Sequence, residues 1–326
     1  MRTITLEEHF TIPAVIEAHQ HHHPAGIAVP PFFKRIMEPL LDLGAGRIAA
    51  MDRDGVDHQT LSLTGGGLTY FDRGLARELA LEANRIVAEA VAKHPDRLSA
   101  FVNLPMLEPE LAAQELETYV RRHGFKGGFI EGTVNGEFLD HPRFLPVFEA
   151  AQALDVPIYL HPSPPPAAVQ QAYFADLEPP FNDLLSTAGW GWHAEVGMHC
   201  LRMMIGGLFD RLPRLKILIG HMGENLPFSI ARAQFILSRG PLNTQRTLEE
   251  YFRENFWLTT AGYFSLPPLD CARQVVGIDR ILYSVDYPFA GMDTGRQFLE
   301  SMRTHLSDEE MEKVAWRNAA ELLKLA

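Results

Sequence analysis

The sequence predicts an α/β protein built as a single (β/α)8 TIM barrel over residues 1–326. Three observations predict this fold. Short apolar or β-branched runs alternate with longer amphipathic patterns about eight times, no break in composition divides the chain, and barrels of this length are common. An open doubly wound sheet is the alternative, but neither G-x-G-x-x-G nor G-x-x-x-x-G-K-[ST] follows an expected strand.

The expected elements follow from these patterns in chain order. The strands share apolar or β-branched residues bounded by turn signals, and we expect them over residues 2–9, 56–64, 98–105, 126–133, 156–162, 215–223, 256–262 and 281–288. Amphipathic helices lie between them, for example over residues 74–95, 109–124, 143–155 and 193–213. Gly or Pro near the end of each pattern is a stop signal.

Two segments depart from the repeat, residues 19–46 and 162–192. They follow expected strands one and five, so in a barrel they would be insertions on the catalytic face. Their prolines predict rigid loops that wall or cover a pocket, with a partner-binding polyproline II stretch at 164–166 as the alternative. The run from His19 to His23 could bind metal, but it has no acidic or Cys companion at ligand spacing. We favour a solvated or pocket-lining loop, with one histidine contacting substrate.

Charge and composition exclude some partners. The formal net charge is −12, which argues against a nucleic acid or an anionic membrane as a partner, since both attract clustered Lys and Arg. No apolar run approaches the length of a transmembrane helix, and no signal-peptide pattern opens the sequence. We therefore expect a cytoplasmic protein.

Polar side chains gather where four expected strands end, which in a barrel is the catalytic face. Strands one, five, six and eight end in these residues: Glu7, Glu8, His9, His161, His221, Glu224 and Asp286. Because side chains alternate along a strand, Glu7 and His9 share one face while Glu8 and Phe10 point away and support the barrel wall.

Four of these residues form a mixed nitrogen and oxygen set that suits one divalent cation: Glu7, His9, His161 and Asp286. We expect Zn²⁺ or Mn²⁺, with Mg²⁺ possible, and an open coordination position as in catalytic sites. Each residue has an ordinary alternative, because His161 could be a hydrogen-bonded core histidine, Asp286 could shape a turn and Glu7 could be a rim charge. Their coincidence at strand ends favours the metal site.

The stretches LEEHF, YLHP, LIGHMGENLPF, LTTAGYF and YSVDYPF, in this order at strand ends, closely resemble the metal-dependent decarboxylase branch of the amidohydrolase superfamily. That branch contains the γ-resorcylate, 5-carboxyvanillate and aminocarboxymuconate semialdehyde decarboxylases, and the resemblance covers nearly the whole chain. Typical amidohydrolases carry His-x-His on the first strand. Here the pattern is Glu7-x-His9, which resembles the γ-resorcylate type.

The resemblance implies roles for individual residues. It makes Glu7, His9, His161 and Asp286 the metal ligands, places His221 as a catalytic or substrate-contacting residue near the ion, and has Glu224 orient His221. By the same resemblance Arg47 and Arg232 bind the substrate carboxylate or hydroxyl, Arg232 across a dimer interface, and Phe289 lines the aromatic ring. Guanidinium groups suit a planar anion, although either arginine could equally be an ordinary surface charge.

The implied reaction is non-oxidative decarboxylation of a hydroxylated aromatic carboxylic acid, such as a dihydroxybenzoate or resorcylate. The metal would chelate phenolate and carboxylate, while Asp286, or alternatively His221, delivers a proton to the ipso carbon. We expect a small aromatic carboxylate as substrate and a homodimer or homotetramer. Two alternatives stay open: a metal hydrolase or hydratase acting on a lactone, amide or alkene, and a non-catalytic barrel that only binds. Ligand spacing does not separate these functions.

Overall fold

Parallel strands and helices alternate along the chain in the computed structural model, which describes residues 1–22, 31–64 and 68–325. The strands are β1 (Ile4–Phe10), β2 (His58–Leu63), β3 (Leu98–Ala100), β4 (Val102–Asn103), β5 (Gly128–Glu131), β6 (Ile158–His161), β7 (Ile217–Ile219), β8 (Phe256–Thr259) and β9 (Ile281–Leu282). Each lies inside an expected strand range except β1, which continues one residue beyond its range, to Phe10. The third expected strand is divided by Phe101 into β3 and β4, so the nine strands of the described chain fill eight positions.

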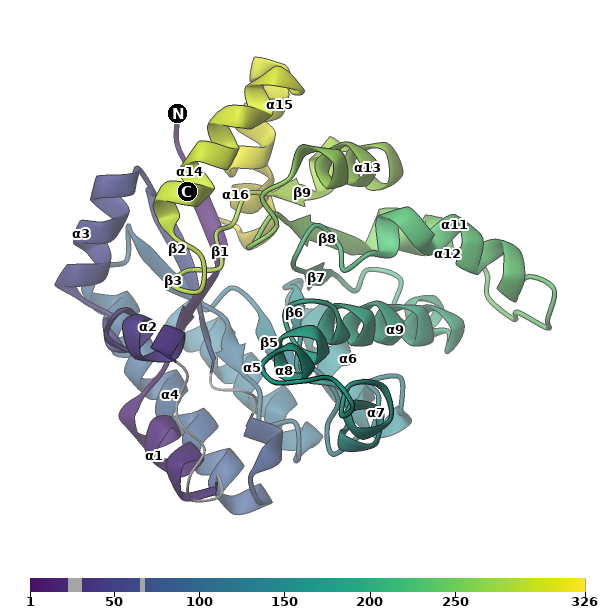
Figure 1. The fold of residues 1–326 in the computed structure, drawn as a ribbon, viewed down its shortest axis with the longest axis horizontal. Coiled ribbons are helices and arrows are strands. Elements are labelled where there is room, and N and C mark those ends of the chain that lie inside the picture. Colours follow the sequence, from purple (N-terminus) through teal and green to yellow (C-terminus); the bar gives the residue numbers. More distant parts are fainter. Residues whose placement is uncertain (23–30, 65–67, 326) are drawn as a thin grey trace.

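The strands close into a barrel. Pairing is parallel throughout, in the orders β1-β2-β3 and β4-β5-β6-β7-β8-β9. At the split, Phe101 N donates to Leu61 O at 2.9 Å. At the other join, His9 N donates to Tyr287 O at 2.7 Å and Glu8 forms a parallel bridge with Tyr287. The predicted (β/α)8 barrel is therefore confirmed, and Figure 1 shows the helices surrounding the strands.

The helices follow their predicted patterns. They are α1 (Pro13–His22), α2 (Pro31–Leu41), α3 (Ala45–Asp54), α4 (Arg73–Lys93), α5 (Pro109–His123), α6 (Leu145–Leu154), α7 (Ala167–Tyr173), α8 (Phe181–Ser186), α9 (Gly191–Ile205), α10 (Leu208–Arg211), α11 (Leu226–Leu237), α12 (Leu248–Asn255), α13 (Leu266–Val276), α14 (Met292–Ser301), α15 (Asp308–Glu312) and α16 (Asn318–Leu323). Local signals set some ends: Asp72 caps α4 by accepting from Gly74 N and Leu75 N, and Gly124 ends α5 in the left-handed conformation. Within the described residues, no helix combines the length and the apolar character that crossing a membrane requires.

The two insertions are more helical than the prolines suggested, and here the loop prediction is wrong. Residues 19–46 contain the end of α1, all of α2 and the start of α3, while 162–192 contain α7, α8 and the start of α9. The reason is that proline is compatible with the first turn of a helix. Pro31 begins α2, and Pro166 and Pro180 directly precede α7 and α8. His19 to His22 end α1, and residue 23 lies outside the described residues.

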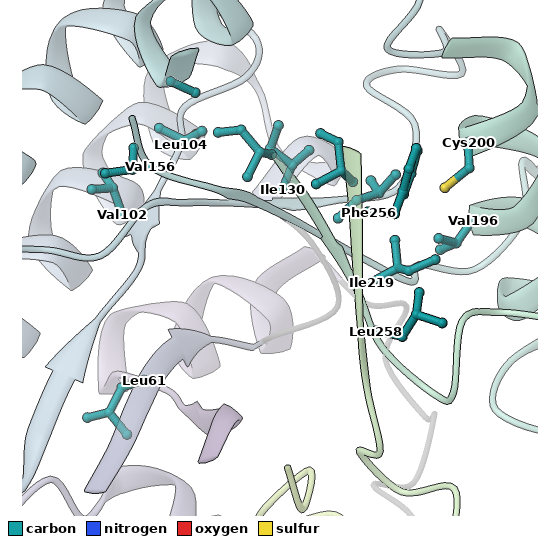
Figure 2. Close-up of a cluster of buried hydrophobic side chains, with 14 of the residues drawn as sticks. Leu61, Val102, Leu104, Ile130, Val156, Val196, Cys200, Ile219, Phe256 and Leu258 are labelled. Carbon is teal, nitrogen blue, oxygen red and sulfur yellow. The ribbon is translucent and has the colours of Figure 1, made fainter. Parts of the chain in front are cut away.

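Two apolar layers hold the fold together. One fills the barrel interior with side chains such as Leu6, Phe129 and Tyr159. The other lies between the strands and the surrounding helices, and Figure 2 shows Ile219 and Leu258 there, near Val196 and Cys200 of α9. Because the interior is filled by side chains, polar groups can gather only at the ends of the strands.

Candidate active site

Strand β1 changes the facing of its side chains partway along. Its pairing with β2 slips between Thr5 and Glu8, where β1 has one more residue than its partner. Leu6 packs in the barrel interior with Tyr159, and the next residue, Glu7, also faces inward because the Tyr159 hydroxyl donates to Glu7 Oε2. A β-bulge re-aims side chains in this way. The bulge thus converts an apolar inward face into the polar face of the site.

The strand ends bring the four predicted ligands together. Glu7, His9 and His161 are buried and each offers a ligand atom within 4.8 Å of the others. Asp286 joins them through its Oδ1 atom, 3.2 Å from His9 Nε2, and His161 Nε2 lies 3.5 Å from Glu7 Oε1. These side chains come from β1, β6 and the segment after β9. The arrangement is the mixed imidazole and carboxylate set that binds a divalent cation.

Contacts with neighbouring groups occupy one side-chain atom each of Glu7, His9 and His161 and leave another atom of each available for a cation. Thr259 Oγ1 donates to Glu7 Oε2 at 2.9 Å, beside the Tyr159 hydroxyl. Ser62 Oγ lies 3.1 Å from His9 Nδ1, and His161 Nδ1 donates to the Pro162 carbonyl at 2.8 Å.

The atoms that remain are Glu7 Oε1 and the two Nε2 atoms. Glu7 Oε1 and His9 Nε2 are buried and make no hydrogen bond of good geometry within the described chain. Buried polar atoms without partners are costly, and outer partners that orient imidazoles are typical of metal sites. A cation therefore fits this cluster.

The pKa shifts of the side chains in the cluster also favour a bound cation. Burial raises the pKa of Glu7, because its carboxylate is removed from water. Burial, together with the nearby His9 and His221, holds the pKa of His161 well below its usual value, so this imidazole is neutral. For His9, burial disfavours protonation, but the close Asp286 carboxylate raises the pKa overall. A neutral His161 is the form that binds metal, and a cation would offset the cost of the buried carboxylate.

The backbone around β7 makes room for Glu7. A Cβ atom on Gly220 would stand 2.6 Å from Glu7 Oε2, so only glycine allows the carboxylate to take this position. Left-handed backbone follows directly, with φ of 47° at His221 and 54° at Glu224, and it recurs at Asp286 with φ of 73°. Non-glycine residues in this conformation are uncommon and gather at functional sites.

A second hydrogen-bonded group adjoins the ligand cluster. Glu224 Oε1 accepts from His221 Nδ1 at 2.8 Å, and Glu224 Oε2 accepts from His193 Nδ1 at 2.6 Å. The remaining His221 nitrogen, Nε2, lies 3.9 Å from Glu7 Oε1. Burial opposes a charge on His221, but Glu224 and Glu7 raise its pKa to about 10, so it is an imidazolium at neutral pH. The structure thus places Glu224 where it holds His221, as the sequence predicted.

Glu8 lies on the other side of β1, as expected. It is buried, and its carboxyl accepts from Ser284 Oγ and Val285 N at 3.0 Å and from Tyr287 N at 3.3 Å. Burial raises its pKa to about 7. Glu8 therefore joins β1 to the segment after β9 and supports the wall of the barrel.

The remaining predicted residues are not all near the cluster. The structure does not bring Arg47 into the site: the side chain is 1% exposed, and it donates to the backbone oxygens of His9 (2.6 Å), Pro39 (3.1 Å) and Asp42 (2.8 Å). Through these hydrogen bonds the guanidinium joins β1 to the α2–α3 segment. Arg232 lies on the exposed side of α11, and the Phe289 ring stands edge-on to His9 at 5.6 Å.

The sequence prediction missed four residues that hold the site: Ser62, Tyr159, His193 and Thr259. Tyr159 had a usable signal, since it precedes His161 by two residues and so shares its face of the strand. Thr259 and Ser62 also stand near strand ends. The sequence around His193 gave no such signal, because this residue lies in the first turn of α9, inside an ordinary helical pattern.

Comparisons with known proteins agree with this geometry. The Amidohydrolase family model matches residues 16–325. Decarboxylase orsB of Emericella nidulans is 36% identical over 96% of this chain and 98% of its own length. A gamma-resorcylate decarboxylase of Polaromonas sp. is also 36% identical, over 99% of this chain and 98% of its own.

Solved structures extend the similarity to the fold and to ligands. A 2,6-dihydroxybenzoate decarboxylase complexed with 2,6-dihydroxybenzoate superposes with a TM-score of 0.90 at 34% identity, covering 100% of both chains. A dihydroxybenzoic acid decarboxylase from Polaromonas sp. with bound manganese and the inhibitor 2-nitroresorcinol gives 0.89 at 36%, covering 99% of this chain and 97% of that one.

Proposed function

This chain belongs to the amidohydrolase family, and from that premise we propose that it is a metal-dependent carboxy-lyase acting on a hydroxylated aromatic carboxylic acid. The observation that carries the proposal is the buried cluster of Glu7, His9 and His161 beside Asp286, with Glu7 Oε1 and His9 Nε2 left without hydrogen bonds in the described chain. Gamma-resorcylate decarboxylases 32–36% identical over 99% of the chain support the reaction and the substrate class.

One divalent cation would be held by Glu7, His9, His161 and Asp286. Zinc or manganese suits this ligand set, and manganese is bound in a similar decarboxylase. When bound, the cation supplies a Lewis acid for the anionic oxygens of the substrate. The Tyr159 and Thr259 hydroxyls keep the Glu7 carboxylate in place for it.

Proton delivery falls to the chain's own residues. We propose that Asp286 takes up the phenol proton when the substrate binds and then donates it to the ring carbon that bears the carboxylate. The bond to the carboxylate then breaks, its electron pair stays with the ring, and CO₂ leaves as aromaticity returns. His221 is the alternative donor, because Glu224 holds its Nδ1 while Nε2 faces the ligand cluster. In the main proposal the His221 imidazolium stabilises negative charge on the substrate.

The exposed face of α11 supports a proposal about assembly. Phe228 and Phe235 on this helix are 90% and 55% exposed, and the Arg232 guanidinium lies 5.7 Å from the Phe235 ring. Figure 1 shows α11 at the periphery of the barrel. We propose a homodimer or homotetramer in which this apolar face packs against a second copy. Arg232 would then reach the partner's site and bind the substrate anion there.

A paired measurement of metal and product tests the proposal. Protein purified without chelator is analysed for divalent ions and then assayed for CO₂ release from 2,6-dihydroxybenzoate, 2,3-dihydroxybenzoate, salicylate, 5-carboxyvanillate and a carboxymuconate semialdehyde. We expect about one metal ion per chain, and CO₂ release that stops on chelation and returns with Mn²⁺ or Zn²⁺. Addition of water to a lactone, amide or alkene without loss of carbon would instead identify a hydrolase or hydratase. Failure to take up any divalent ion would indicate a non-catalytic barrel.

A further inference from the structure

A carboxyl group that has no role in the proposed reaction lies close to the ligand cluster. Glu131 is the last residue of β5, and its side chain is only 13% exposed. It lines a small cavity whose other walls include Leu63, Leu104, Met106 and Phe129. Ligand pockets are typically apolar with a few polar groups that set orientation, and Glu131 supplies such a group here.

The Glu131 carboxyl makes no hydrogen bond with the described residues. His161 Nδ1 lies 3.9 Å away, but this imidazole is neutral and the nitrogen already donates to the Pro162 carbonyl. Two other polar side chains line the cavity, Thr69 and Asn103. Asn103 is occupied, because its Oδ1 accepts from Leu63 N and its Nδ2 donates to Asn84 Oδ1. The side chain keeps part of its surface exposed at the cavity, so these oxygens are available to a ligand.

The cavity and the ligand cluster share a wall. Glu131 is paired with His161 in the β5–β6 ladder, and the Phe129 ring lies 5.3 Å from the His161 ring and 6.1 Å from the His9 ring. Glu131 therefore lies beside the ligand cluster, with its Oε1 atom 3.9 Å from His161 Nδ1, within reach of a substituent on an aromatic ring bound there.

We infer that a carboxyl oxygen of Glu131 accepts a hydrogen bond from a second hydroxyl group on the aromatic substrate. Glu131 thereby selects dihydroxylated acids over acids with a single hydroxyl. An oxygen of the carboxyl can accept whether or not the group is protonated, so the selection does not depend on its charge. A site that hydrogen-bonds a substrate hydroxyl discriminates against the analogue that lacks it. This inference rests on the proposed function, because it assumes that the aromatic acid binds at the Glu7–His9–His161 cluster.

Binding to the manganese-loaded protein provides the first test. The probes are 2-nitroresorcinol, which has two hydroxyl groups, and 2-nitrophenol, which has one. We expect the wild type to prefer 2-nitroresorcinol by roughly 10-fold or more, since about 10-fold is the upper end for a hydrogen bond between uncharged groups. Glu131→Met should reduce the preference to less than about threefold by weakening only 2-nitroresorcinol. Glu131→Gln keeps an acceptor oxygen and should retain more of the preference.

Turnover and matched variants complete the test. Glu117→Met removes an exposed glutamate of α5 and should leave the preference unchanged, and Glu131→Ala replaces Glu131→Met if the latter does not fold. The kcat/KM ratio of dihydroxybenzoates to salicylate should fall with the binding preference. An equal preference in Glu131→Met and wild type, or none in the wild type, would overturn the inference. Absence of CO₂ release from every acid tested would instead count against the proposed function.

Discussion

Adjacent carboxylates on β1 should give opposite results when each is replaced by alanine. Glu7→Ala should abolish tight metal binding with little effect on folding. Glu8→Ala should destabilise the fold and leave metal binding in place. The reason is that the Glu7 carboxyl faces the ligand cluster, whereas the Glu8 carboxyl accepts hydrogen bonds that join β1 to the segment after β9.

The magnitudes follow from what each substitution leaves behind. Without Glu8, the N–H groups of Val285 and Tyr287 lose a buried acceptor, at roughly 1–3 kcal/mol each, so we expect a loss of about 3 kcal/mol in unfolding free energy. Without Glu7, the hydroxyls of Tyr159 and Thr259 still hydrogen-bond each other at 3.1 Å. A buried carboxyl is removed as well, so the change should stay within about 1 kcal/mol.

Two measurements separate these effects. Urea unfolding of the metal-free proteins at pH 4 gives stability at a pH below both the ordinary pKa of a glutamate and the raised pKa of Glu8, so that the cost of keeping this buried carboxyl un-ionised contributes little. Competition with a chromophoric chelator gives Mn²⁺ affinity. For Glu7→Ala we expect affinity to fall by more than the roughly 100-fold typical of losing an outer partner. The reasoning would be refuted if Glu8→Ala lost the metal while folded, or if Glu7→Ala were the less stable of the two.

Three further predictions concern the support of the site and the pH dependence of the fold. His193→Ala should lower kcat about 10-fold and shift its pH profile with little change in KM, because Glu224 loses the partner that fixes it for His221. Gly220→Ala should weaken Mn²⁺ binding by more than about 10-fold, since a Cβ there displaces the Glu7 carboxylate. Burial lowers the pKa of His58 from 6.5 to about 4. As the pH falls from 6.5 to 4, the His58 imidazole therefore takes up a proton only in the unfolded chain. The unfolding free energy should fall by up to about 3 kcal/mol over this range, and His58→Gln should remove this part of the loss.

Each of these has its own check. His193→Gln should recover part of kcat, and an unchanged pH profile in His193→Ala would show that this residue only supports α9. Gly44→Ala is the control for Gly220→Ala, because its Cβ would meet nothing closer than Asp42 Oδ1 at 3.6 Å. The His58 prediction fails if wild type and His58→Gln lose stability in parallel between pH 7.5 and 4.5.

The sequence by itself determined the barrel and predicted the ligand set that we propose. Eight alternations of strand and helix specify the fold because each pattern has its own period and its own stop signals. Polar residues at strand ends then pointed to Glu7, His9, His161 and Asp286, since parallel strands of a barrel all end at one face. These inferences needed only local pattern and one rule of topology. The insertions were assigned wrongly as loops because the same prolines that occur in loops also begin helices.

Only the tertiary structure decided how the proposed ligands are held and where the two arginines lie. The bulge in β1 depends on its register with β2, and the hydroxyls on Glu7 Oε2 come from β6 and β8, more than 150 residues away along the chain. Arg47 matched a substrate-binding position by resemblance, and the fold surrounds it with the carbonyl oxygens of His9, Pro39 and Asp42 and the Gln59 side chain. His193 meets Glu224 only because α9 packs over the end of β7. Such contacts between distant segments leave no periodic trace in the sequence, because they arise from the path of the folded chain rather than from local preference.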